Sequence, residues 1–284
     1  MNWPRAEYRV TATVSPEAGQ SRLLAAEGMD TAHARFLGCD VDGADIRYFD
    51  CAKTGQRALV LESKAGPVTL TYRYGAGPSS YPHAMFTPHD SVFNRRAQAL
   101  TEEARAIAPN LELPQKARAI ACSVAEKFHY GHPEQRFNDG YDHVPALCGL
   151  TEGSCVDINT YFLASLRAAG IEAGYATGYF FPAEKRDRTF EMHCWVVTRY
   201  GDLIEEWDIA HHLKMGTSDI RPAFNPKPGF RSALAHSMGL DFPELGLSDL
   251  KLISQPVWLI GESWEPAELD IRLHHPALNA VAAP

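Results

Sequence analysis

The stretch Gly153-Ser154-Cys155-Val156-Asp157 decides how the chain is organised, because it predicts a turn that leads straight into a helix. Ser154 and Asp157 form an S-x-x-D capping pattern in which Ser154 is the N-cap. Apolar residues then recur at helical spacing as far as Gly170, a residue that favours the end of a helix. Cys155 is therefore predicted to be the first residue of that helix.

The predicted position of Cys155 favours its ionised form. The free N–H groups and the positive end of a helix stabilise a thiolate, and a neighbouring histidine stabilises it further, together by roughly one to five pKa units. Taken alone, Cys155 is better explained as a small buried residue, since free cysteines are usually buried. The sequence downstream of Gly170 reverses that interpretation.

A β-hairpin is predicted between residues 193 and 208, with its turn around Gly201. A Tyr200-Gly201 loop would place His193 opposite Asp208, whereas a Gly201-Asp202 loop, which suits a type II′ turn, would place the two side chains diagonally. Both registers put the two side chains on one face, about 5 to 8 Å apart at Cβ. A three-residue loop would put them on opposite faces. The sequence thus favours a histidine beside a carboxylate.

Cys155, His193 and Asp208 fit the chemistry of nucleophilic catalysis. Cys155 would attack a carbonyl carbon, and His193 would take the thiol proton and later give it to the leaving group. Asp208 would hold the imidazole in one tautomer and stabilise the imidazolium. The backbone N–H of Cys155 is a natural donor to the oxyanion, and a second donor could come from residues 141–150.

The motifs around these residues resemble one known family, the transglutaminase-like superfamily. The likeness covers about residues 145–212 and lies in five motifs in the family's order: G-S-C-V-D at 153, L-R-A-A-G-I-E-A at 166, T-G-Y at 177, H-C-W-V-V at 193 and E-W-D at 206. The resemblance implies that Cys155 is the nucleophile, His193 the base and Asp208 the orienter. It also implies an α+β fold with a papain-like core, in which the cysteine helix packs on an antiparallel sheet.

The composition of the chain limits which binding partners and which cellular compartment are expected. The chain has 284 residues and a net charge of 27 − 35 = −8, which argues against nucleic acid or an anionic membrane surface as the partner. No apolar run approaches the length of a membrane span. The six cysteines show no C-x-x-C spacing, so we expect reduced thiols and a cytoplasmic protein.

Three segments are expected along the chain. Residues 1–90 contain short alternating runs, such as 8–14 and 68–74, that predict an N-terminal β-sandwich or barrel. Residues 91–215 would form the transglutaminase-like catalytic core. Residues 216–284 would pack on that core as a C-terminal extension without chemistry of its own. Within this extension, the sequence predicts a short helix at 230–238 and strands at 255–260 and 269–273.

The predicted core begins with two helices and a long loop. A polar helix is expected at 93–108, and an amphipathic helix beginning at Pro114 should pack against the helix of Cys155. The loop 129–152 and the segment 182–192 would form the walls of the cleft. The loop carries potential zinc ligands, but their spacing fits no standard ligand pattern, so no metal is expected; they are His129, His132, His143 and Cys148.

These observations predict an enzyme that transfers an acyl group through a thioester at Cys155, without a cofactor. Hydrolysis of an amide or peptide bond is the first expectation, and amine transfer or amide synthesis is the alternative. The substrate would be a peptide, a protein or a small amide. A non-catalytic binding scaffold is the opposing class, although a scaffold has no chemical reason to keep all three residues. His211 and His212 are rival bases that lack the H-x-W pattern and rank below His193.

Overall fold

The computed structural model describes residues 7–64, 66–223, 225–261 and 263–276, and its fold is α+β, as predicted. The helical elements are α1 (Gln98–Ala106), α2 (Leu113–Ala125), α3 (Cys155–Ala168) and α4 (Ile209–Lys214), with the 3-10 turns η1 (His83–Phe86) and η2 (Pro243–Leu245). The strands are β1 (Tyr8–Val14), β2 (Arg22–Ala26), β3 (Arg35–Asp42), β4 (Ala44–Asp50), β5 (Arg57–Ser63), β6 (Val68–Gly75), β7 (Phe128–Tyr130), β8 (Thr151–Gly153), β9 (Glu172–Pro182), β10 (Arg188–Thr189), β11 (Met192–Tyr200), β12 (Leu203–Trp207), β13 (Gly229–His236), β14 (Leu240–Phe242), β15 (Leu247–Leu250), β16 (Val257–Ile260), β17 (Ser263–Pro266) and β18 (Asp270–His274).

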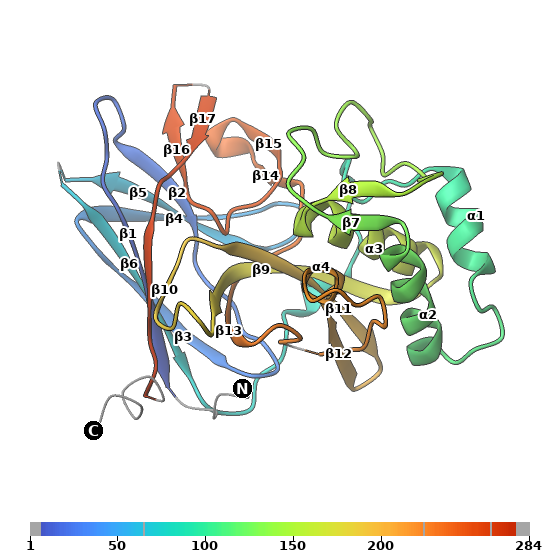
Figure 1. Cartoon of the computed structure of the whole chain (residues 1–284). Helices are drawn as coiled ribbons and strands as arrows, with labels where there is room; N and C mark the ends of the chain where they lie inside the picture. Colours follow the sequence, from blue (N-terminus) through green and yellow to red (C-terminus); the bar gives the residue numbers. More distant parts are fainter. Residues whose placement is uncertain (1–6, 65, 224, 262, 277–284) are drawn as a thin grey trace.

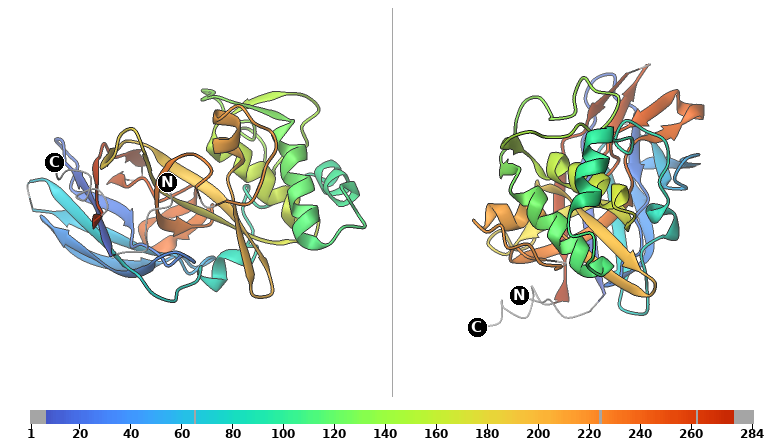
Figure 2. Two further views of the ribbon diagram at one scale, coloured as in Figure 1. Left: turned by 60° about the horizontal axis from the view of Figure 1, so that its bottom comes forward. Right: turned by 90° about the vertical axis from the view of Figure 1, so that its right-hand side faces the viewer.

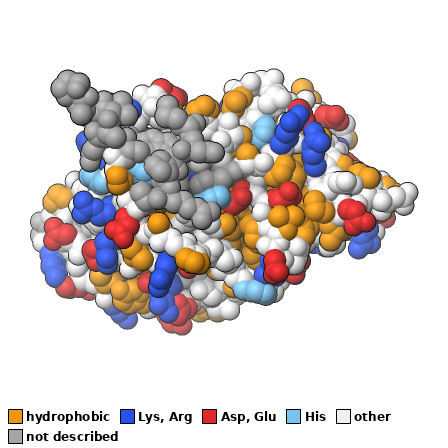
Figure 3. Space-filling view, turned by 90° about the horizontal axis from the view of Figure 1, so that it is seen from below, with side chains coloured by type: hydrophobic (Ala, Val, Ile, Leu, Met, Phe, Trp, Pro, Cys, Tyr) orange, Lys and Arg blue, Asp and Glu red, His pale blue; other side chains and the backbone are white. Residues whose placement is uncertain are grey.

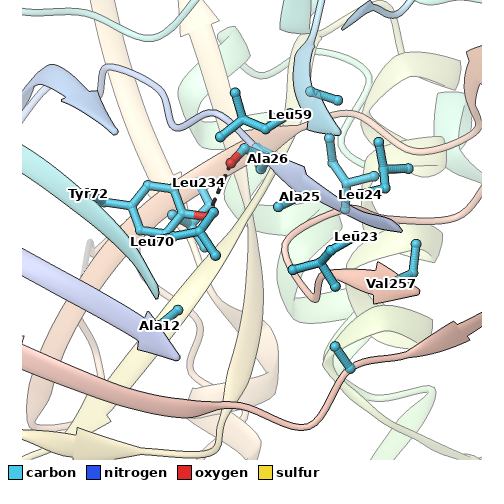
Figure 4. Packing of buried hydrophobic residues seen from close by; sticks show 14 of the residues in the cluster. Ala12, Leu23, Leu24, Ala25, Ala26, Leu59, Leu70, Tyr72, Leu234 and Val257 are labelled. Atoms are coloured by element: carbon cyan, nitrogen blue, oxygen red, sulfur yellow. Dashed lines mark hydrogen bonds between the residues drawn. The ribbon is translucent and has the colours of Figure 1, made fainter. Parts of the chain in front are cut away.

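Two antiparallel sheets form a β-sandwich at one end of the molecule (Figure 1). Their strand orders are β10-β18-β1-β6-β3 and β17-β16-β2-β5-β4. In β1, buried residues alternate with more exposed ones, because one face of the strand meets the other sheet. Figure 4 shows the packed interior, where Tyr72 donates a hydrogen bond of 3.1 Å to the carbonyl of Ala26. Leu24, Leu59 and Leu70 are each at most 1% exposed there, so the sandwich has a dry core.

The C-terminal strands complete this sandwich. β18 pairs with β1, with Leu273 opposite Val10, and β16 pairs with β2, with Val257 opposite Leu24. Residues 216–284 were expected to pack on the catalytic core; β13 does so by pairing with β9, whereas β16 and β18 lie in the sandwich instead. The physical reason is that β1 and β2 would otherwise each leave a row of N–H and C=O groups unpaired at a sheet edge. The boundaries at residues 90 and 215 stay predictions.

The helical end of the molecule is built on a third sheet, with the strand order β12-β11-β9-β13. Ile158 and Phe162 of α3 pack on one face of this sheet, together with Val196 of β11. Trp195 and Val197 point to the other face, where they meet Met85 and Phe86 of η1. This alternation along β11 is the period of two expected for a strand buried on both faces. The predicted packing of the 114-onward helix, α2, against α3 is confirmed.

The hairpin of β11 and β12 settles the register left open by the sequence. Val196 lies opposite Trp207, and Tyr200 lies opposite Leu203, so the loop is Gly201-Asp202. Gly201 has a φ of 62°, in the left-handed region where glycine is favoured. Asp208 follows immediately after β12, which brings it toward the start of β11, as the diagonal arrangement predicted.

The prediction of a short helix at residues 230–238 is wrong, because this segment forms β13. The segment is a strand that runs antiparallel to β9, with Phe230 opposite Phe181. Small residues hid this from the sequence: Ala233 and Leu234 are both buried, on opposite sides of the strand, so no polar alternation marks it. β9 is long enough to run from the helical end into the sandwich, and β13 follows it, as Figures 1 and 2 show.

The surface carries interspersed charges of both signs. Lysine, arginine and acidic side chains alternate over the face seen from below in Figure 3. Ion pairs between exposed side chains include Arg57 with Asp50 at 2.9 Å and Arg73 with Asp40 at 2.7 Å. In the part of the chain that the structure describes, no helix is long and apolar enough to cross a membrane. The expected exclusion of nucleic acid stays a prediction.

His236 in β13 predicts a loss of stability in mild acid. Burial, helped by the charge of His89, lowers the pKa of His236 to about 4. The unfolded chain regains a pKa of about 6.5, so as the pH falls below that value it binds a proton that the folded chain does not. The contribution to stability is thus full above pH ~6.5 and is lost toward pH 4. Between pH 7.5 and 5 the loss is on the order of 2 kcal/mol.

Urea unfolding at pH 7.5 and pH 5 would measure this loss. The His236→Gln variant is expected to lose about 2 kcal/mol less than the wild type over that interval. His129→Gln is the matched control, because His129 is an exposed histidine. Equal losses in the wild type and His236→Gln would contradict the prediction.

Candidate active site

Cys155 is the first residue of α3, as predicted, and Ser154 is its N-cap. One carboxylate oxygen of Asp157, Oδ2, accepts hydrogen bonds from the backbone N–H of Ser154 at 2.8 Å and from its hydroxyl at 2.7 Å. The S-x-x-D pattern therefore forms a capping box at the start of α3. The Cys155 side chain lies in the electropositive first turn and is almost fully buried, since the residue is 8% exposed.

Arg136 adds a second support to this helix start, which the sequence did not reveal. Its Nη1 donates to the hydroxyl of Ser154 at 2.8 Å and lies 3.3 Å from Oδ2 of Asp157. Arg136 belongs to the 129–152 loop, which was expected only to form a wall of the cleft. The loop thus also fixes the segment that presents Cys155.

His193 and Asp208 meet as predicted. The Nε2 atom of His193 on β11 lies 2.7 Å from Oδ2 of Asp208, and both residues are buried. Asp208 is also the N-cap of α4, because its Oδ1 accepts a hydrogen bond of 2.9 Å from the backbone N–H of His211. The carboxylate therefore has one oxygen held by the helix and the other turned to the imidazole.

The remaining ring nitrogen of His193, Nδ1, is available to Cys155. A hydrogen bond from the thiol of Cys194, together with the hydrogen bond and charge of His193, lowers the pKa of the Cys155 thiol well below its usual value. Burial and the charge of Asp208 act in the opposite direction but do not prevail. The site thus favours a thiolate at Cys155, which is the reactive form of the side chain.

The pKa values of His193 and Asp208 are shifted in opposite directions. Burial alone would lower the pKa of His193, but the charge and hydrogen bond of Asp208 outweigh it and raise that pKa. Burial alone would raise the pKa of Asp208, but the charge and hydrogen bond of His193 and the charge of Arg231 lower it well below its usual range. The geometry and charges therefore favour a thiolate, an imidazolium and a carboxylate side by side.

Two further residues lie at the site: Arg231, which the sequence did not single out, and His211, which was expected only as a rival base. The Arg231 guanidinium of β13 pairs with Oδ2 of Asp208, and both side chains are fully buried. The imidazole of His211 lies parallel to that of His193, with ring centroids 3.8 Å apart, and its Nδ1 is 2.9 Å from the same Oδ2. The expectation that residues 216–284 carry no chemistry is therefore wrong for Arg231, which reaches the site because β13 pairs with β9.

His193, Asp208 and His211 also form a group whose ligand atoms all lie within 4.8 Å of one another. Such a set could hold a metal ion on geometry alone. However, the oxygen that a metal would take is already paired with the Arg231 guanidinium, whose positive charge opposes a second cation. The donor set therefore suits an imidazole held by a carboxylate better than a metal centre.

The four loop residues weighed as zinc ligands lie apart from this group. His132 Nε2 lies 3.1 Å from the hydroxyl of Tyr130, His143 pairs with Asp142, and Cys148 is exposed. Within the described ranges, the metal-type grouping of side chains does not include His129, His132, His143 or Cys148.

Cys194 predicts a measurable effect on the nucleophile. In Cys194→Ala, the Cys155 thiolate loses a hydrogen-bond donor, so the acid limb of Cys155 alkylation by iodoacetamide should move up by on the order of one pH unit. Mass spectrometry of the alkylated peptide at each pH would measure it. Cys51→Ala is the matched control, because Cys51 is also a buried free cysteine but lies in the sandwich core. Identical limbs in all three proteins would contradict the role of Cys194.

Comparison with known proteins bears directly on this arrangement. Residues 97–202 match the family model described as the transglutaminase-like superfamily. The chain carries a transglutaminase-like core. The matched residues include Cys155 and His193 and end shortly before Asp208. The matched part of the chain is therefore similar to a family of cysteine-dependent enzymes.

Two solved structures of other proteins are similar to this chain. A presumed cysteine protease from Cytophaga hutchinsonii is 13% identical and has a TM-score of 0.50, with 95% of this chain and 98% of that chain covered. The periplasmic domain of TgpA from Pseudomonas aeruginosa is 17% identical and has a TM-score of 0.37, with 77% of this chain and 92% of that chain covered. No curated protein matches the chain in sequence.

Proposed function

We propose that the protein catalyses acyl transfer through a thioester at Cys155, and that the reaction is hydrolysis of an amide or peptide bond. The observation that carries this proposal is the 2.7 Å contact of His193 Nε2 with Asp208 Oδ2, which leaves Nδ1 of His193 for Cys155 at the start of α3. In this proposal Cys155 is the nucleophile, His193 the general base and acid, and Asp208 the orienter.

The proposed reaction has two halves. In the first, the Cys155 thiolate attacks the carbonyl carbon, and the imidazolium of His193 gives its proton to the departing amine as the C–N bond breaks. In the second, neutral His193 takes a proton from water, the resulting hydroxide attacks the thioester, and the thiolate leaves as the carboxylic acid forms. Asp208 supports the imidazolium in both halves.

The oxyanion that forms in each half would lie at the N-terminus of α3. The first N–H groups of a helix have no partner inside it, and the Cys155 N–H is one of them. The positive end of the helix stabilises both the thiolate and the oxyanion. Thus one structural element would serve the nucleophile and the transition state.

The direction of the pKa shifts defines the active pH range of this proposal. The lowered pKa of Cys155 extends the thiolate form to lower pH, and the raised pKa of His193 extends the imidazolium form to higher pH. Activity should be lost as the pH falls through the Cys155 pKa and as it rises through the His193 pKa. A bell-shaped profile with both groups charged at its top is therefore expected.

The proposal can be tested with a complex mixture of peptides. The wild type and Cys155→Ser would each be incubated with a tryptic digest of a denatured proteome, with and without monodansylcadaverine, and the products read by mass spectrometry. New peptide termini made only by the wild type would support hydrolysis. Dansyl adducts in place of new termini would assign amine transfer instead. Neither product, together with a Cys155 that alkylates like an ordinary thiol, would overturn the proposal and favour a binding scaffold.

A further inference from the structure

Arg231 brings a fourth charge to the proposed catalytic group. It comes from β13, whereas Cys155, His193 and Asp208 come from α3, from β11 and from the end of β12. Its side chain is fully buried and pairs with Oδ2 of Asp208, the oxygen that His193 also contacts. Its guanidinium lies over the ring of Trp195, 4.6 Å from the centroid, so the orientation of the guanidinium is fixed on two sides.

The charges of the site balance only when Arg231 is counted. In the active form Cys155 is negative, His193 positive and Asp208 negative, which leaves one net negative charge in a buried place. A buried, unpaired charge is strongly unfavourable and is usually avoided by a change of protonation. The buried guanidinium of Arg231 brings the sum to zero. An arginine suits this role because its guanidinium stays protonated even when it is buried.

The other titratable side chains near Asp208 and Arg231 do not change this sum of charges. Burial, with the charge of His193 acting in the same direction, lowers the pKa of His211 to about 3, so His211 is neutral near pH 7. Burial raises the pKa of Tyr81 well above its usual value, and the pKa of Cys194 is likewise raised, so both stay neutral. The carboxylate of Glu206 on β12 contacts His33 instead, with Nε2 of His33 at 2.9 Å.

We propose that Arg231 is a charge-balancing and positioning residue, which holds Asp208 ionised and thereby allows Cys155 and His193 to coexist as thiolate and imidazolium. This inference rests on the proposed function. Loss of the positive charge makes an added negative charge at Cys155 less favourable, and it makes loss of the proton from His193 less favourable too. Both limbs of the pH profile therefore move to higher pH when Arg231 is replaced by a neutral residue.

The test is the pH dependence of Cys155 alkylation by iodoacetamide, which needs no substrate. Arg231→Met should move the acid limb up by about one pH unit or more, so that alkylation on the wild-type acid limb slows about tenfold. Arg231→Lys, which keeps the charge, should restore most of the wild-type limb. Arg167→Met is the matched control, because Arg167 is a partly buried arginine that bonds to Asn94 and to the carbonyls of Met85 and Ala173.

The outcomes separate this inference from the proposed function. A wild-type Cys155 that titrates like an ordinary thiol would overturn the proposed function itself. Two outcomes would overturn the role of Arg231 but not the proposed function, provided that the acid limb of Cys155 alkylation lies at low pH in the wild type. In the first, Arg231→Met leaves this limb unchanged. In the second, Arg167→Met moves the limb as far as Arg231→Met does. A shift in Arg231→Met with recovery in Arg231→Lys would support it.

A second pair of variants covers the case in which Arg231→Met fails to fold. Asp208→Asn/Arg231→Met buries no unpaired charge, and asparagine caps α4 as aspartate does. The comparison is then with Asp208→Asn alone. An acid limb about one pH unit higher in the double variant supports the charge-balancing role, and equal limbs overturn it.

Discussion

Replacing Cys155 by serine is expected to reduce turnover by on the order of 10⁴ to 10⁶, with little effect on the fold. The hydroxyl is close to the thiol in size and lies in the same buried first turn of α3, so packing changes little. Its pKa, however, is far above that of a thiol, and the hydrogen bonds that stabilise the Cys155 thiolate cannot ionise it near pH 7. The measurement is kcat/KM on a peptide found by the digest experiment, with the melting temperature as a check on folding.

Cys148→Ser is the control for this experiment, because Cys148 is an exposed free cysteine in the preceding loop. It should keep the wild-type kcat/KM. A Cys155→Ser protein that retains more than about one hundredth of the wild-type rate would exclude a thioester at this position, since the loss of a true nucleophile costs far more.

Asp208→Asn is expected to lower kcat by on the order of 10⁴ while the protein stays folded. The amide can still cap α4, but it no longer favours the imidazolium, and it can hold His193 in the wrong tautomer. Arg231 would also lose its anionic partner, so some loss of stability is expected in addition. The kinetic effect should lie in kcat, because Asp208 is buried and would not contact the substrate.

Glu206→Gln provides the matched control for Asp208→Asn. Glu206 is a mostly buried carboxylate on β12, two residues before Asp208, but its partner is His33. It should change kcat by less than about threefold, since a residue outside the catalytic group affects the barrier little. Similar losses of kcat in Glu206→Gln and Asp208→Asn would mean that the effect is structural, and the orienter assignment would fail.

Local patterns were enough to predict the parts of the site that lie close together in sequence. The S-x-x-D pattern placed Ser154 and Cys155 at the start of α3, and either two-residue loop at the glycine turn brings His193 and Asp208 onto one face. Each of these signals depends on a few neighbouring residues and on backbone geometry. For that reason they needed no knowledge of the tertiary fold.

Residues that reach the site from distant parts of the chain could not be predicted in the same way. Arg231 and Arg136 are ordinary arginines in the sequence, and only the pairing of β13 with β9 and the course of the 129–152 loop bring them to the site. The strand β13 itself was hidden, because both of its faces are buried and its alanines favour a helix. The pairing of β16 with β2 and of β18 with β1 likewise has no local signal.

That pairing has a consequence for how the protein is made on the ribosome. β1 leaves the ribosome first, yet its neighbour β18 follows roughly 260 residues later, which corresponds to about 13 to 50 seconds of synthesis. The interval between the synthesis of β2 and that of its partner β16 is almost as long. During this interval one edge of each growing sheet has no partner from its own chain, and such an edge can pair with another nascent chain. The segment that carries Cys155, His193 and Asp208 is therefore synthesised while the sandwich is still open, before β16 and β18 close it.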